Sequence, residues 1–445
     1  MASTTRVRAR GRGRPQATPA AGAAPGPGAS ATVAPASAPG AHQLRLRRGP
    51  GGSSRLQRVV LVELASAAVL AGWVVGTAGL VVAAVLAAGL LGLAFVRRRG
   101  RSVPDWCATA WALRNRQKRA DALEIPPGTE PGLVPALECE PALRTGAFAV
   151  RDRRPVGIVG DGTFVTAVVQ VEAAPSALRA ERGRQPLPLG LVRDALEVDG
   201  IALESAQVVL HTQPAPALHL PQQSVAVANY APLQAQTGTP AVRITWIALK
   251  LDPELCPEAV AARGGGATGA QRCVVRAAHH LASRLTGAGF RVTVLDEDEL
   301  VAALATSVLA NPLVTAEAGR TEVRQRRTRE SPRNWRCDNR RHTTYWVRSW
   351  PRLSGADGHT LPQFVARLTA VPALATTFSL TLAKGDGKEV SLTGHVRVTG
   401  RSDDELVAAR RALEEAAREA GAGLNRLDRE QLPGVLATLP LGGAR

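Results

Sequence analysis

The chain has 445 residues, a formal net charge of +18 and only 3% aromatic residues. Its positive charge lies mostly before residue 120, and the remaining three quarters are close to neutral, which argues against a general nucleic-acid-binding protein. The five cysteines are widely spaced and form no CxxC pair, so a disulfide framework is not expected.

Residues 1–58 are rich in Ala, Pro, Gly and Ser, and they carry ten arginines and no acidic residue. A segment of this composition cannot bury enough apolar surface to offset the entropy of ordering it, so we predict a disordered tail. Its arginines are candidates for contact with anionic lipid headgroups. The alternative is a solvated tail that only helps to set membrane topology.

From Val59 to Val96 the chain is almost entirely apolar. A single membrane-spanning helix needs roughly 20 residues, so this stretch is long enough for two short spans. Gly76-Thr77-Ala78-Gly79 is the turn-like run that divides it. We therefore predict a transmembrane hairpin at 59–96, with helices over about 59–75 and 78–96.

Arginines flank the hairpin on both outer sides, and none lies in its turn. Positively charged flanks stay on the cytoplasmic side, so a multi-pass protein of the inner (plasma) membrane is expected, with both termini cytoplasmic. The residues that carry this prediction are Arg55, Arg58, Arg97, Arg98, Arg99 and Arg101.

Small residues recur every four positions in the two predicted spans. Such faces let helix backbones approach closely in lipid, either within the hairpin or against another membrane subunit. The alternative is that alanine is simply abundant here. The predicted packing faces are Ala68, Gly72 and Gly76 in the first span and Ala84, Ala88 and Gly92 in the second.

Residues 97–141 are expected to form a basic juxtamembrane helix over Asp105–Ala122 and a Pro/Gly-rich linker over Ile125–Pro141. Residues 142–445 then interleave strand and helix patterns, which predicts a cytoplasmic α/β domain with a mixed sheet and packed helices. The expected strands are Val156–Val159, Phe164–Glu172, Ala206–His211, Val242–Leu251, Phe290–Leu295, Thr343–Trp350, Thr376–Ala383 and Val390–Val398. The expected helices are Leu191–Val198, Ala270–Ala288, Glu297–Leu309, Leu361–Leu368, Asp403–Ala420 and Arg429–Ala437.

Three patterns suggest chemistry, and each has a simpler explanation. The glycine-rich run at 264–269 precedes a helix, but it lacks the Lys and Ser/Thr that a phosphate loop requires. Asp296 and Asp298 form a D-x-D that could hold a divalent metal, although Asp296 is better explained as a helix N-cap. Cys337 and His342 are one pair where a structural zinc site needs four ligands. No catalytic residue, cofactor or metal ion is therefore expected.

The segment Arg320–Arg341 is the densest run of charge in the predicted domain, with nine arginines against three acidic residues. Its net charge of +6 suggests an acidic partner surface, lipid headgroups or RNA, although a solvated insert is the commoner explanation for such a run. The candidate partner-binding residues are Arg324, Arg326, Arg327, Arg329, Arg333 and Trp335.

Taken together, the predicted hairpin, GIVGDGTFVTAVVQVEA (Gly157–Ala173), HTTYWVRSWP (His342–Pro351) and ATLPLG (Ala437–Gly442) resemble EccE, the E component of actinobacterial type VII (ESX) secretion systems. The resemblance implies a structural, non-enzymatic subunit of a membrane secretion complex, with the B, C (ATPase) and D components as partners. It also implies a glycosyltransferase-like fold without an active site. The alternative is a membrane-tethered glycosyltransferase-like enzyme that uses the D-x-D.

Overall fold

The computed structural model describes residues 44–46, 53–95, 97–98, 101–126, 128–149, 154–173, 186–214, 225, 242–320, 326–352, 360–385 and 389–443. Most of the predicted disordered tail, residues 1–58, lies outside this part of the chain, as do Arg99 and Arg324.

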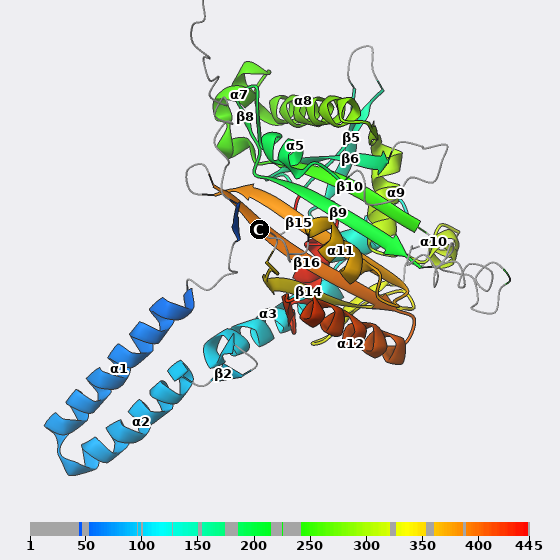
Figure 1. Ribbon diagram of the computed structural model, residues 1–445. Helices are drawn as coiled ribbons and strands as arrows, with labels where there is room; N and C mark the ends of the chain where they lie inside the picture. The colour runs from blue at the N-terminus through cyan, green and yellow to red at the C-terminus, as the bar shows by residue number, and fades with distance from the viewer. Residues whose placement is uncertain are drawn as a thin grey trace, which may run out of the picture. The chain divides into compact units, whose positions relative to one another are not determined.

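A 13-stranded sheet forms the centre of the described fold (Figure 1). Its main path runs through β12 (Thr328–Glu330), β13 (Trp335–Cys337), β14 (Arg340–Ser349), β16 (Val390–Gly400), β15 (Ala375–Lys384), β9 (Ser205–Gln213), β10 (Val242–Leu251), β6 (Val165–Ala173), β5 (Val156–Gly160) and β4 (Arg144–Phe148), in that order. Off this path, β1 (Leu44–Leu46) pairs with β16, β11 (Phe290–Val294) with β6, and β17 (Gly423–Arg426) with β14.

Among the described pairings of this sheet, only that of β1 with β16 is parallel. The sheet is therefore almost entirely antiparallel, where the sequence predicted a mixed one. Two short two-stranded pairs lie apart from it, β2 (Arg97–Arg98) with β3 (Arg101–Ser102) and β7 (Glu197–Val198) with β8 (Ile201–Ala202).

Each face of the sheet has its own core, because successive residues of a strand point to opposite sides. In β9, Val208 and Leu210 belong to the larger core, whereas Val209 belongs to the smaller one. In β10, Ile247 and Trp246 divide in the same way. Apolar residues on both faces explain why the long strands have nearly continuous hydrophobic sequences.

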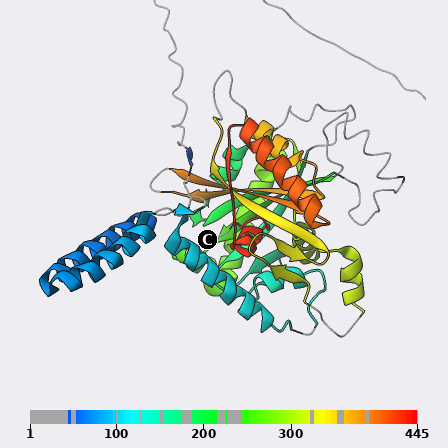
Figure 2. The same ribbon diagram turned by 90° about the horizontal axis from the view of Figure 1, so that it is seen from below.

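Helices cover both faces of the sheet. The larger core takes residues from α5 (Leu189–Asp194), α7 (Pro257–Ala262), α8 (Gly266–Gly287), α11 (Leu361–Thr369) and α12 (Asp403–Glu419), and α7 follows the 3-10 turn at Pro253–Leu255. The smaller core takes residues from α4 (Val134–Cys139), α9 (Glu297–Ser307) and the segment around α13 (Gln431–Leu436). Figure 2 shows α12, in orange, on one side of the sheet.

The short helix α4 lies inside the stretch that the sequence suggested as a linker, residues 125–141. Leu133, Ala136, Leu137 and Cys139 of this stretch are buried in the smaller core. The folded domain therefore begins before residue 142. The proline and glycine residues of this stretch favoured the prediction of a linker, but they flank a short buried helix.

Two local structures follow directly from the residues that form them. Asp161 and Gly162 form the turn between β5 and β6: Gly162 has φ +94°, and Asp161 Oδ1 accepts a hydrogen bond from the Thr163 amide at 2.8 Å. Ser402 caps α12 by accepting a hydrogen bond from the Glu405 amide at 3.1 Å. Gly421, with φ +72°, follows the end of that helix.

The segment after α13 packs on polar side chains of the central strands. Gln207 of β9 donates to the Ala437 carbonyl at 2.9 Å and accepts from the Gly442 amide at 2.8 Å. Ser205 donates to the Gly442 carbonyl at 2.5 Å. Gly442 has φ +96°, and a Cβ there would lie 2.4 Å from the Cβ of Lys250. Only glycine allows this close approach.

The apolar stretch at 59–96 forms two helices, α1 (Ser53–Val75) and α2 (Thr77–Phe95), which pack on each other (Figure 1). Gly76 separates them with φ +103°. A Cβ on Gly72 would lie 2.3 Å from the Cβ of Ala83 and 2.8 Å from the Gly79 carbonyl oxygen, so the two backbones touch there. In the part of the chain whose side chains are described, no helix reaches the length and apolarity of a membrane span.

The predicted packing residues occupy different positions in this pair of helices. Gly72 is buried in the contact, Ala68 is half-buried, and Gly76 is exposed at the break. On α2 the buried residues are Ala83 and Ala87, one position before the predicted face. The residues of that predicted face, Ala84, Ala88 and Gly92, are exposed or half-exposed.

Candidate functional site

The arginine-rich segment 320–341 folds as part of the sheet edge. Its described residues include β12, β13 and the start of β14, which pair with one another in sequence. Arg327, Trp335 and Arg340 are buried, whereas Arg326, Arg329 and Arg333 are exposed. The described part of the segment is therefore not a solvated insert, and its arginines divide into a buried and an exposed group.

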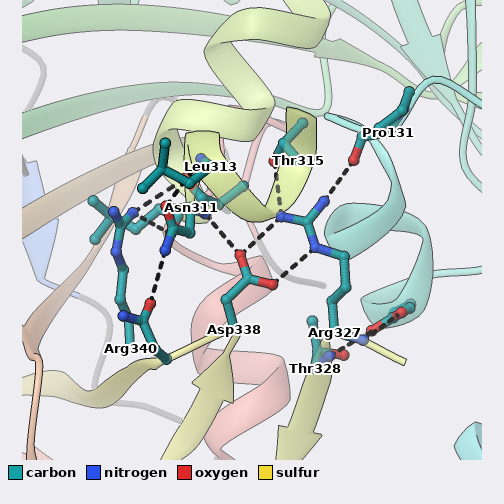
Figure 3. Close-up of polar contacts among 12 residues, drawn as sticks. Pro131, Asn311, Leu313, Thr315, Arg327, Thr328, Asp338 and Arg340 are labelled. Atoms are coloured by element: carbon teal, nitrogen blue, oxygen red, sulfur yellow. Dashed lines mark hydrogen bonds and ion pairs between the residues drawn. The ribbon is translucent and has the colours of Figure 1, made fainter. Parts of the chain in front are cut away.

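The buried group centres on an ion pair between Arg327 and Asp338 (Figure 3). The guanidinium donates from Nε and Nη2 to the two carboxylate oxygens, each at 2.8 Å, and the two side chains are only 4% and 1% exposed. Arg327 also donates to the Pro131 carbonyl at 2.7 Å and to Thr315 Oγ1 at 2.8 Å. Although burial acts to lower the pKa of Arg327, its hydrogen bonds to Asp338 raise it overall. The cation is thus fixed in a two-pronged geometry that lysine cannot supply.

Other groups complete this cluster, which we call the clasp: Glu138, Asn311, Arg327, Asp338 and Arg340. Glu138 of α4 accepts from the amides of Arg327 and Thr328, at 2.9 and 2.6 Å. Asp338 accepts from the Asn311 backbone amide at 2.7 Å, and the Arg340 side chain donates to the Leu309 carbonyl at 2.7 Å. The clasp therefore joins α4, β12, the β13–β14 turn and the start of α10 (Pro312–Ala318).

A second junction ties α3 (Val103–Asp121), the basic helix that follows the hairpin, to β12. Arg116 donates to both carboxylate oxygens of Glu330, at 2.8 and 3.0 Å, and to the Arg429 carbonyl at 2.6 Å. Glu330 also accepts from the Leu432 amide at 3.0 Å. The guanidinium of Arg429 lies 3.8 Å from the ring centroid of Trp106. One buried carboxylate thus connects α3, the sheet edge and the start of α13.

A cleft of about 1010 Å³ lies between α3, α4, β12, β13 and the C-terminal segment. Its floor is apolar and includes Leu143, Phe164 and Trp335. Its charged lining has seven basic and five acidic residues: Arg116, Arg119, Lys250, Arg326, Arg327, Arg329 and Arg336 against Asp121, Glu138, Glu140, Asp161 and Glu330. This cleft is the site in the described chain best suited to receive a partner group.

The charges of the cleft are unequally compensated. Arg326 pairs with Asp121 at 2.9 Å, and Lys250 pairs with Glu204 at 3.2 Å. Arg119 and Arg329 are exposed and enter no ion pair among the described residues. These two arginines are available to an acidic group of a partner, in a cleft whose lining also includes the acidic residues Glu138, Glu140 and Asp161.

The structure distributes the predicted partner residues unevenly. Arg326, Arg327, Arg329 and Trp335 line the cleft, whereas Arg333 does not. Of the topology arginines, Arg55 and Arg58 fall in α1, and Arg97, Arg98 and Arg101 in β2 and β3, with undescribed side chains. The sequence did not reveal Glu138 and Glu330, whose partners lie about 190 and 214 positions away.

The D-x-D at 296–298 is a helix start. Asp296 caps α9 because its side chain accepts from the Glu299 backbone amide at 2.9 Å, and the Glu299 carboxylate accepts from the Asp296 backbone amide at 3.1 Å. This capping box confirms the structural explanation of the motif. Asp296 also pairs with Arg154. The Asp296 carboxylate therefore already has the Glu299 amide and Arg154 as partners. The structure gives no support to a glycosyltransferase-like metal site.

The other two patterns also have local structural explanations. The glycine run links α7 to α8, with positive φ at Gly264, Gly265 and Gly266. Cys337 and His342 lie on neighbouring strands but are not opposite one another, because His342 pairs with Trp335. His342 Nδ1 lies 2.9 Å from Thr399 Oγ1.

Residues 239–347 match the family model described as "Putative type VII ESX secretion system translocon, EccE". The resemblance to the EccE family is confirmed. The EccE match runs from the start of β10 into β14, and it includes Arg327, Asp338 and Arg340 of the clasp. It supports a component of a type VII secretion translocon, which associates with other translocon components. No curated protein matches the chain.

Proposed function

We propose that the protein is a structural, non-enzymatic membrane subunit of a type VII secretion complex. The observation that carries the proposal is the EccE match over residues 239–347. The arrangement of the matched region is consistent with this role, because its buried charges hold elements together. Arg327 and Asp338 bind each other, and Arg340 donates a hydrogen bond to the Leu309 carbonyl within the domain.

The hairpin of α1 and α2 is the proposed membrane anchor. In support, large apolar side chains are exposed around both helices, including Leu64, Leu70, Trp73, Val81 and Leu86. A helix pair that is apolar on its outer surface is unfavourable in water and is typical of a lipid environment. The arginine flanks favour both termini in the cytoplasm.

Cys107 offers a direct test of the anchor and its orientation. It is exposed in α3, and the other four cysteines are buried. In inside-out membrane vesicles, a membrane-impermeant maleimide should label Cys107 of the full-length chain, and in right-side-out vesicles it should not. Cys107→Ser provides the control. Labelling only in right-side-out vesicles, or release of the chain by alkaline carbonate, would contradict the proposed topology.

The cleft is the proposed contact surface for an acidic segment of a sister component, one of the B, C (ATPase) and D subunits. The supporting feature is the pair of exposed arginines, Arg119 and Arg329, that line the cleft without an ion-pair partner among the described residues. Anionic lipid headgroups remain a predicted contact of the N-terminal arginines, and no specific nucleic acid is expected.

Copurification in mild detergent tests both the role and the surface. The full-length chain should bring down other membrane components of the complex. Arg119→Glu combined with Arg329→Glu should reduce their recovery about tenfold, which corresponds to about 1.4 kcal/mol. Arg348→Glu, at an exposed site of β14 outside the cleft, is the matched control. A wild-type chain that migrates alone would end the structural-subunit proposal, whereas an unaffected double variant would only remove the cleft from it.

A further inference from the structure

Arg397 is a buried cation whose position on the sheet is unusual. It belongs to β16, is 0% exposed, and lies opposite Thr344 of β14 and Thr377 of β15. Its Nη2 donates to the Ser307 carbonyl at the end of α9. Its Nε and Nη1 have no hydrogen-bond partner within the described residues. A buried guanidinium with two unused donors is costly unless something else binds them.

Three neighbouring side chains also carry unpartnered buried atoms. These atoms are Trp335 Nε1, His342 Nε2 and Thr344 Oγ1, among the residues that the structure describes. The register brings them together, because Trp335 is opposite His342 and Thr344 is opposite Arg397. The Trp335 and His342 ring centroids are 4.9 Å apart. Polar atoms from β13, β14 and β16 therefore gather on one face of the sheet, beneath the smaller core.

All five of the unpartnered atoms on Arg397, Trp335, His342 and Thr344 can act as hydrogen-bond donors. The indole Nε1 and the guanidinium nitrogens only donate, and a hydroxyl can do so. His342 Nδ1 is 2.9 Å from Thr399 Oγ1, so a hydrogen bond accepted from Thr399 leaves the ring proton on Nε2. Burial keeps the pKa of His342 well below its usual value, so the ring is neutral. The cluster thus presents up to five donors.

No group of the described chain neutralises Arg397. Burial lowers its pKa only to about 10, so it stays charged at neutral pH. Burial raises the pKa of the nearby thiols Cys139 and Cys337, which are therefore protonated. The acids of the region are engaged elsewhere: Glu138 and Asp338 in the clasp, and Glu330 with Arg116.

We propose that Arg397, Trp335, His342 and Thr344 form a buried binding site for a small monovalent anion of the chloride type. The anion would accept hydrogen bonds from the unpartnered donors and neutralise the guanidinium. A buried water molecule could accept some of those bonds, but it would leave the positive charge uncompensated. The site is internal and structural, and it does not depend on the proposed secretion role.

Thermal unfolding of the full-length chain in mild detergent tests the site. At constant ionic strength, replacing gluconate by chloride should raise the wild-type Tm by about 4 °C, since a ligand that binds only the folded state stabilises it. Arg397→Met should remove the chloride dependence. Arg348→Met, at an exposed arginine of β14, should keep it. Equal wild-type Tm values in the two salts would overturn the proposal.

Crystals of the wild-type chain grown in bromide provide a test that needs no variant. An anomalous peak beside the guanidinium of Arg397 is the expected result. Ordinary water density at that position, without an anomalous peak, would show that the donors are hydrated and would overturn the proposal.

Discussion

Glu330 and Arg116 form a two-bonded ion pair, at 2.8 and 3.0 Å, although 214 positions separate them in the chain. The Glu330 side chain is 5% exposed and the Arg116 side chain 22%. Because α3 directly follows the hairpin, this pair fixes the helix nearest to the proposed anchor onto the edge of the sheet. The Glu330 carboxylate is therefore a main connection between α3 and β12, beside the Gln117 bond to the Glu330 carbonyl and the Arg326–Asp121 pair.

Replacing Glu330 by glutamine should loosen α3. The change keeps the size of the side chain but removes its charge, so Arg116 and the Leu432 amide lose a charged acceptor. We expect a loss of about 2 kcal/mol in the free energy of unfolding, measured by denaturant titration, together with faster tryptic cleavage near Lys118. Glu415→Gln, at an exposed site of α12, should change neither quantity.

The Arg327–Asp338 pair should show strong coupling in a double-mutant cycle. Asp338→Leu leaves a buried guanidinium without its counterion and should cost about 3–5 kcal/mol. Arg327→Met combined with Asp338→Leu should cost less than Asp338→Leu alone, because no unpaired charge remains. Costs that simply add would show that the pair is not a coupled unit.

Gly72 should be intolerant of a side chain and Gly89 tolerant. A Cβ at Gly72 would lie 2.3 Å from the Ala83 Cβ, whereas a Cβ at Gly89 meets nothing within 4 Å. Gly72→Leu should therefore separate α1 from α2. Spin labels at Val60 and Leu91, near the open ends of the two helices, should report a longer distance by pulsed electron resonance. The same labels in the Gly89→Leu variant should report the wild-type distance.

Acid should destabilise the domain partly through His211. Its ring is 0% exposed, and burial lowers its pKa to about 3. The unfolded chain binds a proton at this site near pH 6.5 and the folded chain does not, so stability is full above pH 6.5 and falls as the pH drops towards 3. His211→Gln should reduce the slope of unfolding free energy against pH by up to about 1.4 kcal/mol per unit in this window. An unchanged slope would contradict this assignment.

The long elements were predictable from the sequence because their signals are local. Every strand expected within residues 142–445 has a counterpart in the structure, and so does every helix, although the expected helix Leu191–Val198 ends at Asp194 and its residues Glu197–Val198 form β7. Apolar runs bounded by turn residues mark β9, β10 and β15, and Ser402 and Gly421 mark the ends of α12. Such signals need no knowledge of distant partners.

The site was only partly predictable because its partners are remote. The segment 320–341 is rich in arginine, and a run of charged residues usually indicates a solvent-exposed segment. Arg327 is buried by contacts that include Glu138 and Pro131, which lie about 190 positions earlier in the chain. The packing residues of α2 were predicted incorrectly for a different reason. Alanine is so frequent in α2 that four-residue spacing could not distinguish Ala83 and Ala87 from Ala84 and Ala88.

The hydrogen bonds of Gln207 constrain the order in which the chain can fold during its synthesis. Its side chain lies in a central strand, yet its hydrogen-bond partners at Ala437 and Gly442 are 230 and 235 positions later. At a typical translation rate these partners emerge roughly 10–50 s after Gln207 does. During that interval a nascent β9 has an unfilled polar face. This polar face is therefore completed only near the end of translation, long after the N-terminal hairpin has been synthesised.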